Sequence, residues 1–235
     1  MLIFLKIDIF LLINNSNNRM DTIEKDNVVG VYSKIATHFS DTRPHQWSWI
    51  TSYIRRITRN YPNYPLVLDI GCGNGRNMDG FKPDYVYGID NCQEFVDICK
   101  KRGKNVVLGD MTNIVFPNHV FDDLLCIASF HHLSTEQRRI NALLEMHRVT
   151  KEGGTMLLSV WSIRQPANTK QAKNITDYGD IIVSWDKYGE IYERYYYIFK
   201  VEEIKELFKK TGWRVVSHTW DYGNEIFILE KETMR

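Results

Sequence analysis

The 235-residue sequence is poor in cysteine and carries almost no net charge. Its four cysteines form no C-x-x-C pair and show no metal-ligand spacing, which argues against a disulfide framework or a zinc site and indicates a reducing compartment. The net charge of +1 creates no global field that would attract a nucleic acid. With 43% hydrophobic and 25% charged residues, the composition is that of an ordinary soluble globular protein.

Long hydrophobic runs are also missing. The most apolar stretch, MLIFLKIDIFLLI at residues 1–13, is too short to span a bilayer and is interrupted by Lys6 and Asp8. The NNSNN that follows offers no small-residue cleavage site for a signal peptide. Residues 1–19 could therefore be a dispensable leader, a segment docked on the domain or a membrane tether. We expect a leader, one domain over residues 20–235, no membrane partner, and a cytoplasmic location with the nucleus as the alternative.

From Met20 onward, helical and strand-like stretches alternate, which predicts a parallel sheet with crossover helices. Helices are expected at residues 21–39, 45–57, 136–148 and 201–210. Strands are expected at residues 66–70, 85–89, 105–108, 122–130, 153–161, 214–222 and 224–231, the last two as a hairpin. Residues 162–179 show no clear period and predict a loop, and residues 195–197 predict a strand or an extended loop.

Three glycines at alternate positions follow the first expected strand in LVLDIGCGNGR, residues 66–76. The spacing of Gly71, Gly73 and Gly75 departs from the dinucleotide fingerprint G-x-G-x-x-G, because residue 76 is Arg. A dinucleotide loop, a loop for another nucleotide-like cofactor and a plain turn are the alternatives. Asp90 closes the second expected strand in YGID, where an acid can accept hydrogen bonds from both ribose hydroxyls of either NAD or S-adenosylmethionine.

Asp110 distinguishes between these cofactors, because LGDM closes the third expected strand with an acid in position to reach an adenine edge. The final hairpin also fits a methyltransferase sheet better than a dehydrogenase, and the chain leaves little room for a separate substrate domain. At the glycines, backbone N–H groups could approach the methionine carboxylate. The expected cofactor-binding residues are Asp69, Gly71, Gly73, Gly75, Asp90, Asn91, Asp110, Met111 and Ala128.

Together, VLDIGCGNGR, YGID and GDM resemble the class I S-adenosylmethionine-dependent methyltransferases. This resemblance implies S-adenosyl-L-methionine as the cofactor and an α/β fold, a Rossmann-like seven-stranded sheet of order 3-2-1-4-5-7-6 with helices on both faces. HFSDTR (38–43), SFHHLSTEQRR (129–139), VSWDK (183–187) and ERYYYIFKVEEI (193–204) resemble a narrower family. It is the eukaryotic tRNA carboxymethyluridine methyltransferases, which include the methyltransferase domain of the AlkB-homologue tRNA enzymes.

The narrower resemblance implies an enzyme that methylates the carboxylate of 5-carboxymethyluridine at the tRNA wobble position, giving the methyl ester. The chain departs from the family at Leu133, where Trp is usual, at Ser184, where Pro is usual, and at Glu225 and Ile226, where two Trp are usual. These departures concern the substrate pocket more than the reaction. A small-molecule methyltransferase acting on a carboxylate or quinone-type substrate, and a non-catalytic RNA- or protein-binding module, are the alternatives.

Methylation of a carboxylate requires alignment and desolvation rather than a general base, because a carboxyl with a pKa of about 4 is already ionised at neutral pH. Arginine is the best side chain to grip a carboxylate, and we assign this role to Arg43 and Arg194, with surface arginines as the alternative. Of the adjacent His131 and His132, we expect His132 to contact the substrate while the other packs or caps, with a purely structural pair as the alternative. An extruded uridine could stack on one of Tyr195, Tyr196 and Tyr197, of which we name Tyr195 as the site residue, while core packing is the alternative for at least one of the three. No metal ligand is expected.

The resemblance also implies two partners. One is the tRNA anticodon stem-loop, which basic clusters such as Arg138 with Arg139 would contact if several of them lined one rim. The other is a small zinc-ribbon activator protein that pairs with the strand at residues 105–109. That strand reads NVVLG, without proline or an interior charge, and is expected at a sheet edge. Shielding of the edge by Lys104, the leader or a loop is the alternative.

Overall fold

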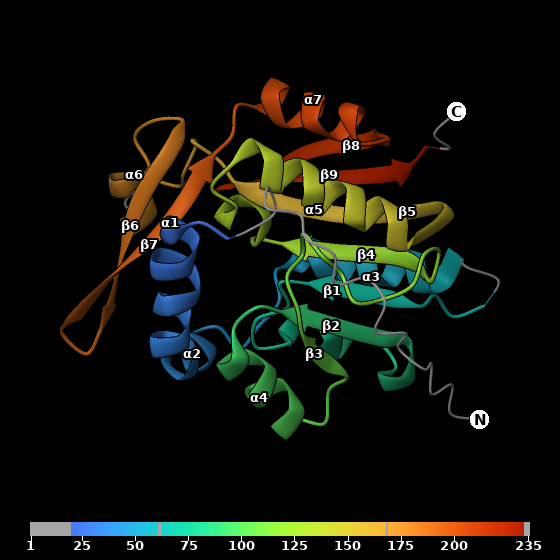
Figure 1. The fold of residues 1–235 in the computed structure, drawn as a ribbon, viewed down its shortest axis with the longest axis horizontal. Helices are drawn as coiled ribbons and strands as arrows, with labels where there is room; N and C mark the ends of the chain where they lie inside the picture. Colours follow the sequence, from blue (N-terminus) through green and yellow to red (C-terminus); the bar gives the residue numbers. More distant parts are fainter. Residues whose placement is uncertain (1–19, 61–62, 168, 233–235) are drawn as a thin grey trace.

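Seven strands form one mixed sheet in the order β3-β2-β1-β4-β5-β9-β8 (Figure 1). The computed structural model describes residues 20–60, 63–167 and 169–232, so the expectation for residues 1–19 lies outside the described residues. The predicted order is confirmed, since β8 and β9 are the sixth and seventh strands that the sequence predicts. The sheet strands are β1 (Val67–Ile70), β2 (Val86–Asp90), β3 (Val106–Leu108), β4 (Phe121–Ile127), β5 (Thr150–Trp161), β8 (Trp213–Asp221) and β9 (Asn224–Lys231).

Helices cover both faces of this sheet. Apolar residues of α5 and α7 pack on one face, and those of α3 and α4 pack on the other. The α-helices are α1 (Thr22–Glu24), α2 (Gly30–Thr42), α3 (Ser48–Asn60), α4 (Gln93–Lys101), α5 (Glu136–Val149), α6 (Lys170–Asn174) and α7 (Val201–Lys210). A π-helix, η2 (Lys25–Val29), and the 3-10 helices η3 (Arg76–Gly80), η4 (Pro83–Tyr85) and η5 (Phe130–His132) complete the set.

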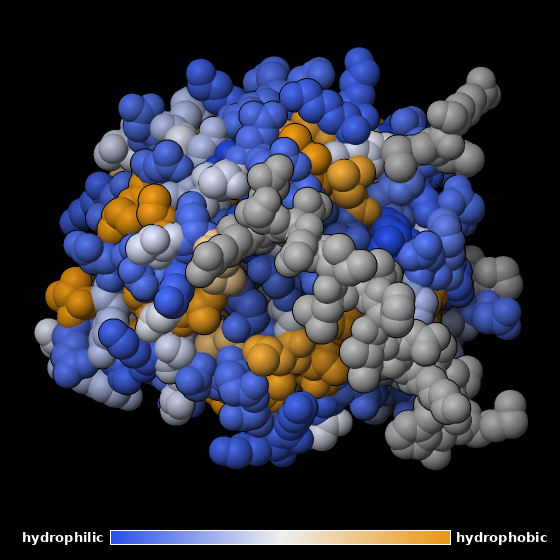
Figure 2. Space-filling view, viewed as in Figure 1, coloured by the Kyte–Doolittle hydropathy of each residue, from blue (hydrophilic) through white to orange (hydrophobic). Residues whose placement is uncertain are grey.

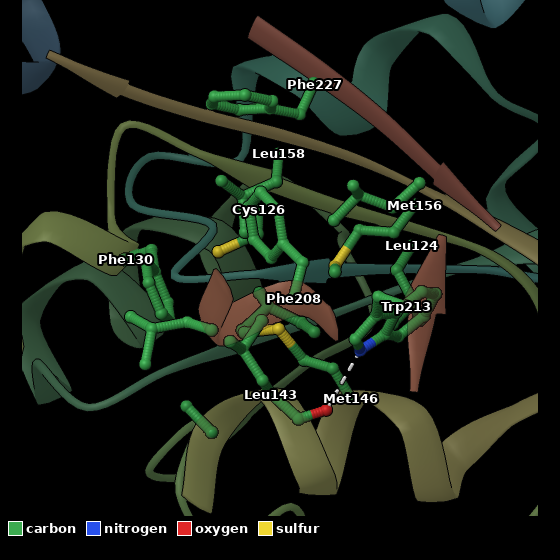
Figure 3. Packing of buried hydrophobic residues seen from close by; sticks show 14 of the residues in the cluster. Leu124, Cys126, Phe130, Leu143, Met146, Met156, Leu158, Phe208, Trp213 and Phe227 are labelled. Atoms are coloured by element: carbon green, nitrogen blue, oxygen red, sulfur yellow. Dashed lines mark hydrogen bonds between the residues drawn. The ribbon is translucent and has the colours of Figure 1, made fainter. Parts of the chain in front are cut away.

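The core between the sheet and α5 illustrates why the helices lie where they do (Figure 3). Leu143 and Met146 follow the helical period and are fully buried against the sheet. Trp213, which is 1% exposed, begins β8 in the same cluster, and its indole N–H donates to the Leu143 carbonyl at 3.1 Å. The hydrogen bond satisfies the indole, so a large aromatic ring can be buried without an unpaired donor.

A second, two-stranded sheet was not predicted. The strands β6 (Gly179–Lys187) and β7 (Glu190–Ile198) form a hairpin that lies beside α2 (Figure 1). Trp185 of β6 packs against Val31 and Ile35 of α2, which joins the hairpin to the N-terminal helices. The expected helix at residues 21–39 is present but contains the π-helical turn η2 and continues to Thr42, and the expected loop at 162–179 contains the short helix α6.

Polar and charged side chains dominate the described part of the face shown in Figure 2, and its hydrophobic patches are separate from one another. No helix within the described residues combines the length and the apolar character that a membrane span requires. Most of the large apolar side chains of the described residues lie in the interior.

Candidate functional site

A cleft of about 270 Å³ lies where β1, β2, β4 and β5 end. The carboxyl ends of parallel strands are where open α/β sheets bind ligands. Loops following these strands form its floor, and the N-terminal helices together with β7 form a wall. The additional hairpin and the sheet therefore enclose one site.

The loop after β1 holds its shape through glycine. Gly71 has φ +67°, and a Cβ atom added there would lie 2.5 Å from the Ser129 Cβ, so no side chain fits. Gly73 has φ +54° and no atom within 4 Å of an added Cβ, which leaves open space ahead of the backbone. Both glycines border the cleft, whereas Gly75 lies against the Lys104 side chain and does not. The strand-loop geometry thus lets a ligand approach the main chain closely.

Asp90 at the end of β2 borders the cleft beside Asn91. One Asp90 carboxylate oxygen accepts the Gly73 N–H at 2.8 Å, and the other accepts the Cys92 N–H at 2.9 Å. Burial raises the pKa of the Asp90 carboxyl to about 6, against the opposing effect of these two hydrogen bonds. Each oxygen keeps a second lone pair, so the fixed carboxylate can accept two hydroxyl groups.

Asp69 lies beneath the glycine loop and does not border the cleft. Its carboxylate is fully buried, and neither oxygen has a hydrogen-bond partner among the described residues. Burial, together with the charge of Asp90, raises the pKa of Asp69 to about 7. An unpaired buried acid favours a cation placed above it. S-adenosylmethionine carries an ammonium and a sulfonium group, so the Asp69 carboxylate suits that cofactor. It would act through its electric field rather than through the direct contact that we expected.

Asp110, the acid expected to reach adenine, is held in a network. One of its oxygens accepts the N–H and the hydroxyl of Thr112, and the other accepts an N–H of Arg138 at 2.8 Å. Arg138 also donates to Glu24 of α1 at 2.9 Å, so the network ties the N-terminal helix to the cleft. Asp110 still borders the cleft, with 27% of its side chain exposed.

Met111 and Ala128 also border the cleft. Ala128 follows β4 with φ +51°, a left-handed conformation that costs an alanine conformational energy. Its N–H donates to the Ser159 carbonyl at 3.0 Å, and this bond to β5 holds the turn in place.

The cluster of Arg138 with Arg139 does not form a surface for RNA, because both residues are buried. Arg139 lies over the Tyr197 ring, with its guanidinium carbon 3.4 Å from the ring centroid, and donates to the carbonyls of Leu133 and Ser134. Both arginines are structural, contrary to the surface role considered for them.

Arg43 and Arg194 come together around a single aromatic ring. Their guanidinium carbons lie 4.5 and 4.7 Å from the Trp185 ring centroid. Arg43 directly follows α2, Arg194 comes from β7, and both border the cleft. No carboxylate among the described residues forms an ion pair with either one. Burial, then the charge of Arg194, lowers the pKa of Arg43. Because neither arginine has a carboxylate partner among the described residues, an anionic ligand would supply the counter-charge.

A third arginine was missed by the sequence reasoning. Arg76 borders the cleft, and its guanidinium carbon lies 4.6 Å from the Trp47 ring centroid. Burial, followed by the charge of Arg43, lowers the pKa of Arg76 to about 10. The signal was present, because Arg76 is the residue that breaks the dinucleotide fingerprint.

Both histidines border the cleft, although only one was expected to. His132 Nδ1 lies 2.8 Å from the Tyr195 carbonyl and must donate to it, so its Nε2 accepts the Tyr32 hydroxyl at 3.1 Å. Burial lowers the pKa of His132 to about 3 and that of His131 well below its ordinary value. His131 Nδ1 accepts the Trp161 N–H at 3.0 Å. Both rings are therefore neutral, and neither nitrogen of His132 is unpaired.

Tyr195 does not reach the cleft, and Tyr196 takes the position expected of it. Alternate side chains of a strand face opposite ways, so β7 directs Arg194 and Tyr196 into the cleft and turns Tyr195 away. The Tyr195 hydroxyl donates to Asp180 at 2.5 Å. Tyr196 stacks on Trp161, with ring centroids 4.1 Å apart and an interplanar angle of 8°. Tyr196 is buried between Trp161 and His132, whose ring centroid lies 4.5 Å away, so it supports Trp161 from behind.

Comparison with known proteins shows that this chain is similar to methyltransferases. Residues 68–158 match the model of a family described as a methyltransferase domain. The chain is 32% identical to a Schizosaccharomyces pombe protein named tRNA (carboxymethyluridine(34)-5-O)-methyltransferase, over 88% of this chain and 97% of that one. It is 28% identical to a Xenopus tropicalis protein with the same activity in its name, over 89% of this chain but only 41% of the longer frog protein.

Solved structures share the fold. An S-adenosylmethionine-dependent methyltransferase from Clostridium acetobutylicum superposes with a TM-score of 0.65 at 16% identity, covering 86% of this chain and 99% of that one. A Haloferax volcanii methyltransferase in complex with the Trm112 activator superposes with a TM-score of 0.61 at 15% identity, covering 88% and 99%. The class I methyltransferase fold predicted from the sequence is thereby confirmed.

Proposed function

The chain belongs to the family of tRNA (carboxymethyluridine(34)-5-O)-methyltransferases, and we propose that it methylates the carboxylate of 5-carboxymethyluridine at the tRNA wobble position. S-adenosylmethionine is the methyl donor, and the product is the methyl ester. The observation that carries the proposal is the pair Arg43 and Arg194, two guanidinium groups around one indole without a carboxylate partner among the described residues. Such a pair binds an anionic substrate more strongly than a neutral one.

The residues around the glycine loop fit the cofactor. When bound, S-adenosylmethionine supplies an electrophilic methyl group on its sulfonium. Asp90 would accept the ribose hydroxyls through the lone pairs that its two backbone hydrogen bonds leave free. Gly71 and Gly73 keep the loop free of side chains beside the methionine portion, while Asp69, once the bound cation favours its ionised form, would provide a negative field below it.

The remaining side chains position the substrate. Arg43 and Arg194 would hold the carboxylate, and Trp161, backed by Tyr196, would support the pyrimidine ring. The neutral histidines agree with this chemistry, because an ionised carboxylate needs no general base. Holding the two reacting groups in alignment is the main contribution that remains for the protein, and well-aligned systems gain up to about 7–11 kcal/mol from it.

Mass spectrometry of nucleosides tests the proposal directly. An anticodon stem-loop with 5-carboxymethyluridine at the wobble position should gain one methyl group per molecule when incubated with the protein and S-adenosylmethionine. The matched RNA carrying the neutral 5-carbamoylmethyluridine should not react. Absence of methylation in the presence of a required activator protein, or equal reaction of both RNAs, would refute the proposal.

Arginine variants test the observation that carries it. Arg194→Ala and Arg43→Ala should each lower kcat/KM by about 10- to 150-fold, as expected for the loss of a charge-assisted hydrogen bond. Affinity for S-adenosylhomocysteine should change little, which calorimetry would establish. Arg55→Ala on the exposed surface of α3 is the matched control. Loss of cofactor binding in the Arg43 variant would instead assign Arg43 to the methionine carboxylate.

A small activator protein belongs to the same proposal. β3 lies at the sheet edge, and Leu108 at its end is 50% exposed. The structural neighbour with a Trm112 activator supports a partner of this kind, which would add a strand to β3. Leu108→Lys should abolish co-purification with the activator while S-adenosylhomocysteine still binds. Full activity of the chain alone, unaffected by the activator, would contradict this part.

The cytoplasm is the compartment we propose. The four cysteines are free and buried, which is the form expected where thiols stay reduced. Localisation of a fluorescent fusion would check this, and a signal confined to a secretory organelle would contradict it.

A further inference from the structure

An exposed aromatic cluster adjoins the mouth of the cleft. It consists of Trp220, Tyr222 and Arg164, and is called here the aromatic rim. Trp220 is 41% exposed and Tyr222 is 65% exposed, and both lie where β8 turns into β9. Tyr222 itself borders the cleft, as do its neighbours Gly223 and Gln165. The rim is therefore continuous with the candidate site without being part of its interior.

Trp220 and Arg164 of the rim are held in place before any ligand arrives. The Trp220 indole N–H donates to the Arg164 carbonyl at 3.0 Å, and the Arg164 guanidinium carbon lies 5.5 Å from the Trp220 ring centroid. Arg164 also reaches Glu225 at 3.4 Å, and Glu225 is fixed by Ser162 at 2.6 Å and His218 at 2.7 Å. Aromatic rings ordered in advance lose little conformational entropy when a ligand stacks on them.

We propose that the aromatic rim stacks an unpaired nucleotide next to the target uridine. A nucleotide whose base enters the cleft is covalently joined to its neighbours, which must then pass the rim. Exposed aromatic rings with an arginine nearby are the usual way in which proteins hold unpaired bases. The inference rests on the proposed function, since it requires the target uridine to be part of an RNA strand.

Charge at the rim favours stacking over phosphate attraction. The Arg164 side chain is 65% exposed, whereas its partner Glu225 is buried. Asp221, between the two aromatic residues, is exposed and carries the opposite charge. These opposing charges leave the aromatic surface as the main source of binding, so the contribution of the rim should persist when salt weakens the phosphate contacts.

Binding of RNA with an abasic site tests the inference without requiring turnover. The probe is an anticodon stem-loop with uridine at the wobble position, titrated in the presence of S-adenosylhomocysteine. We expect Trp220→Ala and Tyr222→Ala each to weaken binding by about 5- to 150-fold. An abasic nucleotide on one side of the target should weaken wild-type binding by a similar factor. At least one of the two variants should bind this abasic RNA about as well as it binds the intact RNA.

Matched controls keep the outcomes distinct. Trp220→Phe retains a ring and should recover most of the affinity. Tyr85→Ala should have no effect, because Tyr85 is 40% exposed just before β2, which lies far from β8 in the strand order. Wild-type affinity in both alanine variants would overturn the inference. It would also be overturned if, for both abasic RNAs, the loss of affinity in each variant were the full product of the loss caused by the substitution and the loss caused by the abasic site. Loss of activator binding with RNA binding intact would also overturn it. Failure of wild type to methylate the modified RNA would instead refute the proposed function.

Discussion

Replacing Asp69 by asparagine should remove a large pH-dependent decrease in the free energy of unfolding of the cofactor-free protein. Asp69 is fully buried without a hydrogen-bond partner among the described residues, and burial, with the charge of Asp90, raises its pKa to about 7. An unfolded aspartate has a pKa of about 3.9. The folded protein therefore holds a proton that the unfolded chain releases. The resulting stabilisation is complete below a pH of about 4 and is lost as the pH rises through about 7.

The size of the effect follows from the separation of the two pKa values. About three units correspond to about 4 kcal/mol over the whole titration, of which about 2.5 kcal/mol falls between a pH of about 5 and a pH of about 8. The asparagine side chain of the variant cannot ionise, so the free energy of unfolding of the wild type should fall by about this amount relative to Asp69→Asn over that interval. The cost of burying the amide is the same at both pH values and cancels in the comparison.

Urea unfolding of both proteins at the two pH values, without cofactor, measures this difference. Asp90 titrates in both proteins and largely cancels. Asp84→Asn, at an exposed aspartate of η4, is the matched control and should show no such dependence. A difference between wild type and Asp69→Asn that stays constant with pH would show that Asp69 is ionised throughout and would refute the reasoning.

Three further predictions concern the cofactor side of the cleft. Affinity for S-adenosylhomocysteine should fall as the pH drops below about 6, because protonated Asp90 loses acceptor capacity for the ribose hydroxyls; calorimetry across pH would show it, and a flat profile would contradict it. Arg138→Met should destabilise the protein by about 3–5 kcal/mol in urea unfolding, since two carboxylates lose their guanidinium partner, and an unchanged midpoint would contradict this. Gly71→Ala should abolish cofactor binding because its Cβ would meet Ser129, whereas Gly153→Ala, with φ +70° and open space, should retain it; equal binding by both would be the contrary result.

The sheet was predictable from sequence because its strands are marked by local patterns. Apolar runs ending in Asp69, Asp90 and Asp110 place the strands and their carboxyl ends, and the observed order is the predicted one. The hairpin β6–β7 was not predicted, because one of its faces packs on α2 and the resulting alternation follows a partner far away in sequence. The π-helical turn in η2 likewise leaves no mark in the helical periodicity.

The residue types of the site were easier to predict from the sequence than the directions in which their side chains point. Arg43 and Arg194 border the cleft as expected, although 151 positions separate them in the numbering, and their roles remain predictions. Tyr195 was chosen over Tyr196 because the register of β7 relative to the cleft cannot be read from three consecutive tyrosines. The burial of Arg138 depends on Glu24 and Asp110, neither of which is near it in sequence.

The arginine pair around Trp185 has a consequence for the end of the proposed reaction. Esterification removes the negative charge from the substrate, so the product is neutral where the two guanidinium groups meet. Burial and, after it, the charge of Arg194 lower the pKa of Arg43, and no bound anion then offsets these two effects. The site therefore holds the acid more tightly than its ester. The charge that admits the substrate disappears in the reaction, and its disappearance favours release of the finished tRNA.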